Sequence, residues 1–282
     1  MKRIGFLLFL ALFAASTLSF DWPQQLSGED DFSQLFGRER HGALSSGIVF
    51  AQENNVYAGE TSTLLMVMGE SENISSFDST LGNTVITMNY DNIMNVYGNL
   101  SSISLQPAMS TVKEGQSIGM GGKSGWKDGH SGSEFQIMDV QSRVALNPFE
   151  ILPKYETDVK VSLRSLVLVS SNDKVYDFFS GQNVPPGKYM LYGNIAPRLP
   201  ITKTEISVNG SKVETLKFDR LIDEDGRLAV SGSANRTFET MIYDGKQFLG
   251  ELTLSRGRSA IRISINDISG TKTGFNYTIE VH

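Results

Sequence analysis

Leu81-Gly82-Asn83-Thr84-Val85-Ile86 and Ser133-Glu134-Phe135-Gln136-Ile137 bracket the segment around which this chain is organised. Between them, residues 96–103 and 112–119 are short alternating apolar runs, separated by Gly, Asn and Ser. Alternation with a period of two, bounded by turn residues, is typical of consecutive antiparallel strands. The segment therefore predicts a compact, turn-rich β-sheet, and any function depends on which side chains lie on one face of that sheet.

The N-terminus has the layout of a secretory signal. Residues 1–3 include two basic side chains, residues 4–15 are almost all apolar, and residues 16–19 are mostly small. The apolar run is short for a membrane span, so residues 1–19 are predicted to be a cleaved signal peptide, with an uncleaved anchor as the alternative. The mature chain would then be exported to the periplasm or the exterior of a bacterial cell, and it would meet a membrane only through this segment.

The sequence contains no cysteine, so it has neither a disulfide framework nor a thiol nucleophile.

Charge divides the chain into two unequal parts. Residues 20–150 carry 6 Lys or Arg against 16 Asp or Glu, whereas residues 151–282 carry 17 against 15. The acidic first part argues against nucleic acid as a partner, because phosphate binding requires a basic face.

The second part has the strand spacing of a β-sandwich. Turn signals such as Asn209-Gly210 and Asp244-Gly245 separate short apolar runs, and Asp225-Gly226 predicts a further hairpin. The strands are expected at residues 159–169, 187–194, 204–208, 212–218, 228–231, 237–243, 247–254, 261–266 and 275–281. We therefore predict an all-β chain with a β domain at 20–152, an extended connection at Pro148 and Pro153, and an immunoglobulin-like β-sandwich at 153–282.

The order of motifs in the first part resembles the lysostaphin-type (LytM) zinc endopeptidases, which cut peptidoglycan cross-links. The family pattern runs from a Phe-Gly turn through His-x-Gly-Ile-Asp-Phe, Val-x-Ala-Ala-Gly, Gly-Asn-x-Val-x-Ile and Leu-Tyr-x-His-Leu-Ser. It then continues through Val-x-x-Gly-Gln-x-Ile-Gly to His-x-His-Phe-Glu-Ile. The corresponding blocks here are residues 36–37, 45–50, 56–59, 82–86, 96–101, 112–119 and 132–137.

The resemblance implies a catalytic zinc that this sequence does not supply. Where the family has its three metal ligands, this chain has Ser45, Val49 and Glu134, and where the family has two assisting histidines it has Asn99 and Gly132. A catalytic zinc requires about three nitrogen, sulfur or carboxylate ligands. Valine cannot coordinate and a neutral serine hydroxyl is a poor ligand, so no zinc or other cofactor is expected.

The histidines offer one alternative metal site. His41 lies four residues before Ser45, where the sequence supplies no acid, and His282 ends the chain. His130 lies in a Gly- and Ser-rich segment with Asp128 and Glu134 nearby, and these three could form a different site.

We therefore interpret the chain as a non-catalytic LytM-type envelope protein. It would bind peptidoglycan or regulate a cell-wall hydrolase, through a groove lined by the five degenerate positions. Two alternatives stay open, namely an active peptidoglycan metalloendopeptidase with atypical ligands and a structural or adhesive envelope protein.

Overall fold

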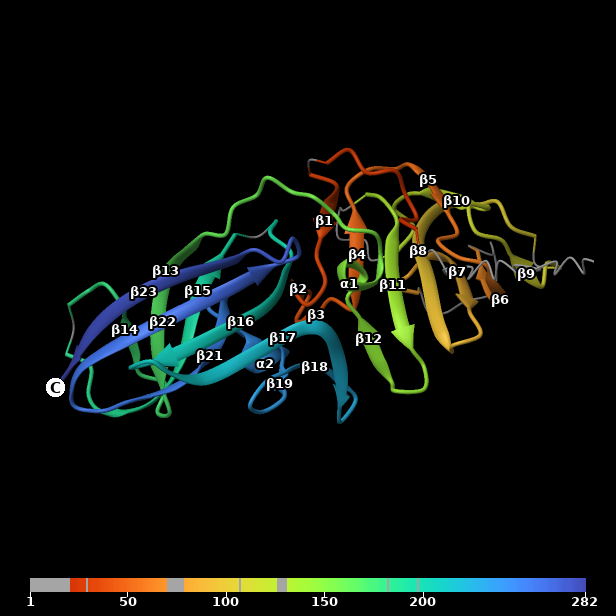
Figure 1. The fold of residues 1–282 in the computed structure, drawn as a ribbon. Coiled ribbons are helices and arrows are strands. Elements are labelled where there is room, and N and C mark those ends of the chain that lie inside the picture. Colours follow the sequence, from red (N-terminus) through yellow and green to blue (C-terminus); the bar gives the residue numbers. More distant parts are fainter. Residues whose placement is uncertain are drawn as a thin grey trace, which may run out of the picture.

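The structure is a computed structural model that describes residues 21–28, 30–69, 79–106, 108–125, 131–181, 183–196 and 198–282. Almost all of its regular structure is antiparallel β-strand (Figure 1), which confirms the predicted all-β class. The predicted signal peptide lies outside the described residues. Among the helices of the described ranges, none is long and apolar enough to cross a membrane.

The first part is built around neighbouring strands of one antiparallel sheet. Strand β11 lies between β4 and β8, and β8 continues through β7 to β6 and β9. The strands of this part are β1 (Phe32–Gln34), β2 (Glu39–Arg40), β3 (Ala43–Leu44), β4 (Gly47–Phe50), β5 (Asn55–Tyr57), β6 (Ser62–Met68), β7 (Asn83–Met88), β8 (Ile93–Ile103), β9 (Thr111–Val112), β10 (Ser117–Gly121), β11 (Glu134–Asp139) and β12 (Val144–Leu146). Alternate residues of these strands, such as Phe135 and Ile137, are fully buried on one face.

The second part has two facing layers. One layer has the order β14-β13-β15-β21-β20, and the other contains β23-β22-β16-β17 with β18 and β19 beside β17. Strand β21 packs against β16 and β17 across the interior. The elements are β13 (Leu163–Ser170), β14 (Val175–Asp177), β15 (Gly187–Ile195), β16 (Ile201–Val208), β17 (Ser211–Glu224), β18 (Arg227–Ser231), β19 (Arg236–Thr237), α2 (Phe238–Met241), β20 (Ile242–Tyr243), β21 (Lys246–Leu254), β22 (Gly257–Asp267) and β23 (Lys272–Val281).

The predicted hairpin turns of the second part are confirmed. At each of Asn209-Gly210, Asp225-Gly226 and Asp244-Gly245 both residues have positive φ, and the flanking strand residues pair directly. This is the backbone geometry that two-residue hairpins require. The strand predicted at 237–243 was wrong in its centre, because Phe238–Met241 forms one helical turn in which the Ile242 N–H donates to the Phe238 carbonyl.

The junction is only partly as predicted. Asn147 and Leu152, the residues before the two prolines, are extended as expected, but Pro148–Ile151 between them forms the short helix α1. The Asn147 side chain accepts the Phe149 N–H and so caps this helix, while Pro148 occupies its first turn. The helical turn makes this connection shorter than the fully extended one that was predicted.

Strand pairing runs without a break from one part to the other. Val144, Ala145 and Leu146 of β12 pair with residues 220–222 of β17, so one sheet continues through both parts. This pairing also explains why β17 extends well beyond the strand predicted at 212–218.

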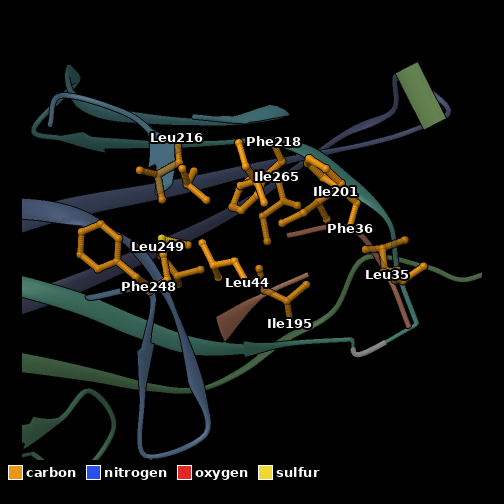
Figure 2. Close-up of a cluster of buried hydrophobic side chains, with 14 of the residues drawn as sticks. Leu35, Phe36, Leu44, Ile195, Ile201, Leu216, Phe218, Phe248, Leu249 and Ile265 are labelled. Carbon is orange, nitrogen blue, oxygen red and sulfur yellow. The ribbon is translucent and has the colours of Figure 1, made fainter. Parts of the chain in front are cut away.

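The hydrophobic core also crosses the junction. Leu35, Phe36 and Leu44 of the first part lie among sandwich side chains such as Phe218 and Leu249 (Figure 2). On the other side of the junction Trp22 stacks near Phe149, and its indole nitrogen donates to the Pro153 carbonyl at 2.9 Å. Shared packing of this kind fixes the two parts relative to each other, while the boundary at residue 152 and the immunoglobulin-like topology remain predictions.

Candidate functional site

The strand register brings four of the five degenerate positions together. Glu134, the first residue of β11, lies opposite Val49 of β4 on one side and Gly98 of β8 on the other. Asn99 directly follows Gly98, and Gly132 lies two residues before Glu134. The order of blocks in the sequence therefore corresponds to one small region of the sheet.

Glu134 is buried and fully paired. Its Oε2 lies 2.9 Å from Nη1 of Arg40, and its Oε1 accepts a hydrogen bond of 2.6 Å from the Gln136 side-chain amide. The side chains of Arg40 and Glu134 are only 6% and 3% exposed. A cation supplied by the chain itself thus sits against the one carboxylate that could have served as a metal ligand.

Ser45 and Val49 are buried as well, but neither takes part in an ion pair that the structure describes. The Ser45 hydroxyl donates to the Gly47 carbonyl at 3.0 Å, and its backbone pairs with Gly37 and Arg38. Val49 has no exposed surface. Both positions serve local packing rather than presenting a group to a ligand.

Asn99 holds the neighbouring loops. Its side-chain amide donates to the carbonyls of Gly122 and Gly132 at 2.9 and 2.8 Å, and its carbonyl accepts the Gly125 N–H at 2.7 Å. Its φ of +56° is the left-handed conformation that asparagine tolerates well. The side chain is therefore committed to three backbone groups within the protein.

Gly132 has no room for a side chain. Its φ is +100°, and a Cβ built at this position would lie 2.1 Å from the Phe50 carbonyl oxygen. A histidine at this position would require movement of the backbone on both sides of the site.

These five positions do not fit a catalytic zinc. Only Glu134 has a suitable donor atom, and a guanidinium occupies one side of it. His41 lies at the exposed turn between β2 and β3. Within the described ranges, no three or more His, Cys, Asp or Glu side chains are grouped so that they could hold a metal ion. Asp128 and His130, which form the alternative site with Glu134, lie outside the described residues.

A row of methionines on the outward face of the same sheet was missed by the sequence analysis. Met88 pairs with Met94, and Met94 pairs with Met138, across β7, β8 and β11. Met66 on β6 adds to this row beside Ile86 and is 48% exposed. We call Met66, Met88, Met94 and Met138 the methionine row. Strands β7, β8 and β11 each contain a single methionine, so no local repeat in the sequence indicates the row.

On the opposite, inner face of this sheet lies a second buried carboxylate, which the sequence analysis also missed. Glu60 accepts hydrogen bonds from the side-chain amides of Asn95 at 2.7 Å and Asn89 at 3.0 Å. Burial raises the pKa of the Glu60 carboxyl, and these hydrogen bonds oppose the shift only in part. The nearby side chains of Ser62 and Thr87 are also buried, so this interior is unusually polar.

Comparison with known proteins gives distant similarities only. A family model matches residues 160–282, which is less than half of the chain. No curated protein matches the chain. The catalytic domain of the prophage-encoded protein EnpA from Enterococcus faecalis is 22% identical, with 46% of this chain and 95% of that chain covered and a TM-score of 0.37.

Two further solved structures are similar at the same low level. Lysostaphin is 15% identical over 91% of this chain and 89% of its own, with a TM-score of 0.36. A chain of the SpoIIQ–SpoIIIAH pore forming complex is 24% identical over 48% of this chain and 82% of that chain, with a TM-score of 0.32. The residue roles described above come from the geometry of this chain alone.

Proposed function

We propose that this chain is a non-catalytic LytM-type protein of the bacterial cell envelope, which acts by binding rather than by cleavage. The observation that supports this proposal is the buried ion pair between Arg40 and Glu134. A guanidinium cannot act as a Lewis acid or activate a metal-bound water, so a carboxylate paired with it has lost the chemistry of a zinc site. The seven sequence blocks in family order support the LytM assignment.

The methionine row favours a protein partner over the peptidoglycan itself. Its side chains are half-buried or exposed, and cross-strand pairing joins Met88, Met94 and Met138, while Met66 lies opposite Ile86 on β7. Methionine is flexible and polarizable, and it is common on surfaces that bind varied protein segments. Contact with a cell-wall hydrolase, whose activity the chain would regulate, is the form of the proposal that this surface supports best.

The absence of catalysis is tested by metal analysis and a cleavage assay on the mature protein, residues 20–282. We expect less than about 0.1 zinc per chain after incubation with excess zinc and dialysis, and no release of peptides from purified peptidoglycan, because only one of the three ligand positions carries a donor. Stoichiometric zinc that is lost in Glu134→Ala would overturn the proposal. It would instead favour the alternative of an active metalloendopeptidase.

The binding surface is tested with charged substitutions in the methionine row. The mature protein, Met94→Lys and the control Met120→Lys are each used to capture partners from insoluble cell wall and from a detergent extract of the envelope. Met120 is 43% exposed on β10, outside the row, so it controls for the added charge. We expect wild type and Met120→Lys to capture a hydrolase from the extract, and Met94→Lys to capture at least about tenfold less of it. The reason is that the charged lysine would have to lose its water when the methionine row is covered by the partner.

Two results would contradict this form of the proposal. Retention on insoluble wall that Met94→Lys leaves unchanged, with no hydrolase captured, would favour direct peptidoglycan binding. Equal capture by all three proteins would show that the methionine row takes no part and would favour a structural or adhesive role of the sandwich.

A further inference from the structure

The outward face of β23, β22, β16 and β17 is strongly basic in an otherwise acidic chain. These four strands lie side by side in the sandwich layer (Figure 1). Alternate residues point away from the core, and the charged ones among them are mostly cationic. The cationic side chains of this basic face are Lys203, Lys212, Lys217, Arg258, Arg262 and Lys272.

Two carboxylates on the same face leave most of this charge uncompensated. Glu280 lies opposite Arg258 in the register of β22 and β23. Glu205 is shared by three ammonium groups, those of Lys272 at 2.5 Å, Lys203 at 3.4 Å and Lys212 at 3.9 Å. Six cations against two carboxylates give a surplus of four positive charges, whereas the whole chain has a net charge of −6.

Part of the surplus is not engaged by any acid. Within the ranges that the structure describes, Lys217, Arg258 and Arg262 form no ion pair. The hydrogen bond from Lys272 has the largest effect on the Glu205 carboxyl and lowers its pKa, and the charge of Lys203 also lowers it. Burial acts in the opposite direction but does not offset these two effects. The local potential is therefore positive at the centre of the face as well as at its edges.

A shallow cleft crosses this basic face between β16, β17, β22 and β23. Its volume is about 620 Å³. The cations that line it are interleaved with hydroxyl and amide groups; among its lining residues are Lys212, Arg262, Lys272, Ser207, Asn276 and Thr278. Strand β22 has 11 residues, so the face is about 35 Å long at about 3.3 Å per residue. The cleft takes up part of that length, from Ala260 to Ser264 on β22, and it offers both charge-assisted and neutral hydrogen bonds there.

We propose that this basic face binds a linear anionic polysaccharide. Regularly spaced carboxylates or other acidic groups would pair with the cations, and the sugar hydroxyls would bond with the serine, threonine and asparagine side chains. An acidic peptide fits less well. Peptide recognition on a sheet uses edge pairing or pockets for alternate side chains, whereas this surface is the outward face of strands that already pair with one another. The proposal does not rest on the function assigned to the first part of the chain.

Binding is tested with the mature protein and polygalacturonate, a linear polysaccharide with one carboxylate per sugar. The neutral polysaccharide dextran and the acidic peptide polyglutamate are measured beside it by calorimetry. We expect polygalacturonate to bind at 50 mM salt, with affinity falling by at least about tenfold at 300 mM because bound counterions are released. Dextran should not bind, and polyglutamate should bind at least about tenfold more weakly than polygalacturonate.

Matched charge variants locate the site. Arg262→Gln with Lys272→Gln removes two cations from the cleft, while Lys160→Gln with Arg164→Gln removes two exposed cations outside it. We expect a loss of at least about tenfold in affinity for the first pair and less than about twofold for the second. Circular dichroism and the thermal midpoint establish that both double variants are folded.

Each remaining outcome overturns the proposal. The absence of polygalacturonate binding at 50 mM salt excludes the face as a polyanion site. Equal losses in the two double variants would mean that net charge, rather than this cleft, determines binding. Polyglutamate binding as tightly as polygalacturonate would assign the face to an acidic peptide or protein segment.

Discussion

Charged side chains are buried and paired at the degenerate site around Glu134 in the first part, whereas they are exposed and in surplus on the basic face of the second part. In the first part, Glu134 and Arg40 are buried and neutralise each other, and the amide of Asn99 is used entirely by backbone groups. On the basic face, Arg262 and its neighbours are exposed, and three ammonium groups share Glu205. Polar groups that satisfy one another stabilise a fold, whereas an exposed surplus of one sign is available to a ligand.

This contrast separates positions whose polar groups are used within the protein from a surface whose charges face solvent. The resemblance of the first part draws attention to Ser45, Val49 and Glu134, yet each of these is buried. The second part has no motif of its own, and its face is evident only from the side-chain directions on four strands. The following predictions test how firmly the first region is closed.

The largest effect is expected at Gly132. Gly132→Ala would force a Cβ to within 2.1 Å of the Phe50 carbonyl oxygen at a φ of +100°. We expect the free energy of unfolding to fall by at least about 4 kcal/mol, because backbone on both sides would have to move. Urea denaturation followed by tryptophan fluorescence measures the change.

Gly181→Ala is the matched control for that substitution. Gly181 also has positive φ, +68°, but an added Cβ would meet nothing within 4 Å. Its loss should be limited to about 1 kcal/mol of left-handed strain. Similar losses at the two glycines would show that the region around Gly132 is looser than the contact implies, and would weaken the contrast between a closed site and an open face.

A somewhat smaller effect is expected from breaking the buried ion pair. Glu134→Ala leaves the Arg40 guanidinium buried beside an apolar methyl group, and we expect a loss of about 3–4 kcal/mol in the free energy of unfolding. Glu134→Leu combined with Arg40→Met should be less destabilised than Glu134→Leu or Arg40→Met alone, since the double variant removes both members of the ion pair. A urea double-mutant cycle measures the coupling.

The exposed Glu39 of the same hairpin provides the control for the cycle. Its side chain is exposed and accepts a 3.3 Å hydrogen bond from the Gly42 N–H, so Glu39→Ala should change stability by less than about 0.5 kcal/mol. If Glu134→Ala had an equally small effect, the pair would contribute nothing to closure. Glu134 would then be open to another ligand.

Local signals in the sequence were sufficient for the turns and for the positions of many strands. Asparagine or aspartate followed by glycine favours a turn in which both residues have positive φ. Such a turn involves only four consecutive residues, so the signal is entirely local. Period-two alternation likewise predicted the strands around Phe135 and Tyr97. Both signals depend on neighbours in sequence, which is why they were correct.

The remaining features depend on contacts between distant residues. Arg40 and Glu134 are 94 residues apart, and nothing near Arg40 indicates that its side chain turns inward. Beyond residue 218, β17 pairs with the distant β12 as well as with its neighbour β18, and the methionine row becomes a surface only when four strands are placed in register. The helical turn Phe238–Met241 has no side-chain cap, so no local signal distinguished it from strand.

The last prediction extends the comparison to Glu60, the buried carboxylate that has amide partners but no cation. Burial raises its pKa in the folded state above the ordinary value of 4.5. A raised pKa stabilises the fold fully below about pH 4.5, and this contribution is lost as the pH rises through the folded pKa. Wild type should therefore lose stability relative to Glu60→Gln as the pH rises from 4.5 towards neutrality.

Urea denaturation at several pH values measures this difference, with Glu114→Gln as the control. Glu114 is exposed, so the difference between wild type and its variant should stay constant with pH. In Glu60→Gln an amide faces the amides of Asn89 and Asn95, which adds an offset that does not depend on pH; only the slope is diagnostic. A slope of the opposite sign would mean that the hydrogen bonds from the two asparagines outweigh burial. Glu60 would then be a buried carboxylate held in its charged form by amide groups rather than by a cation.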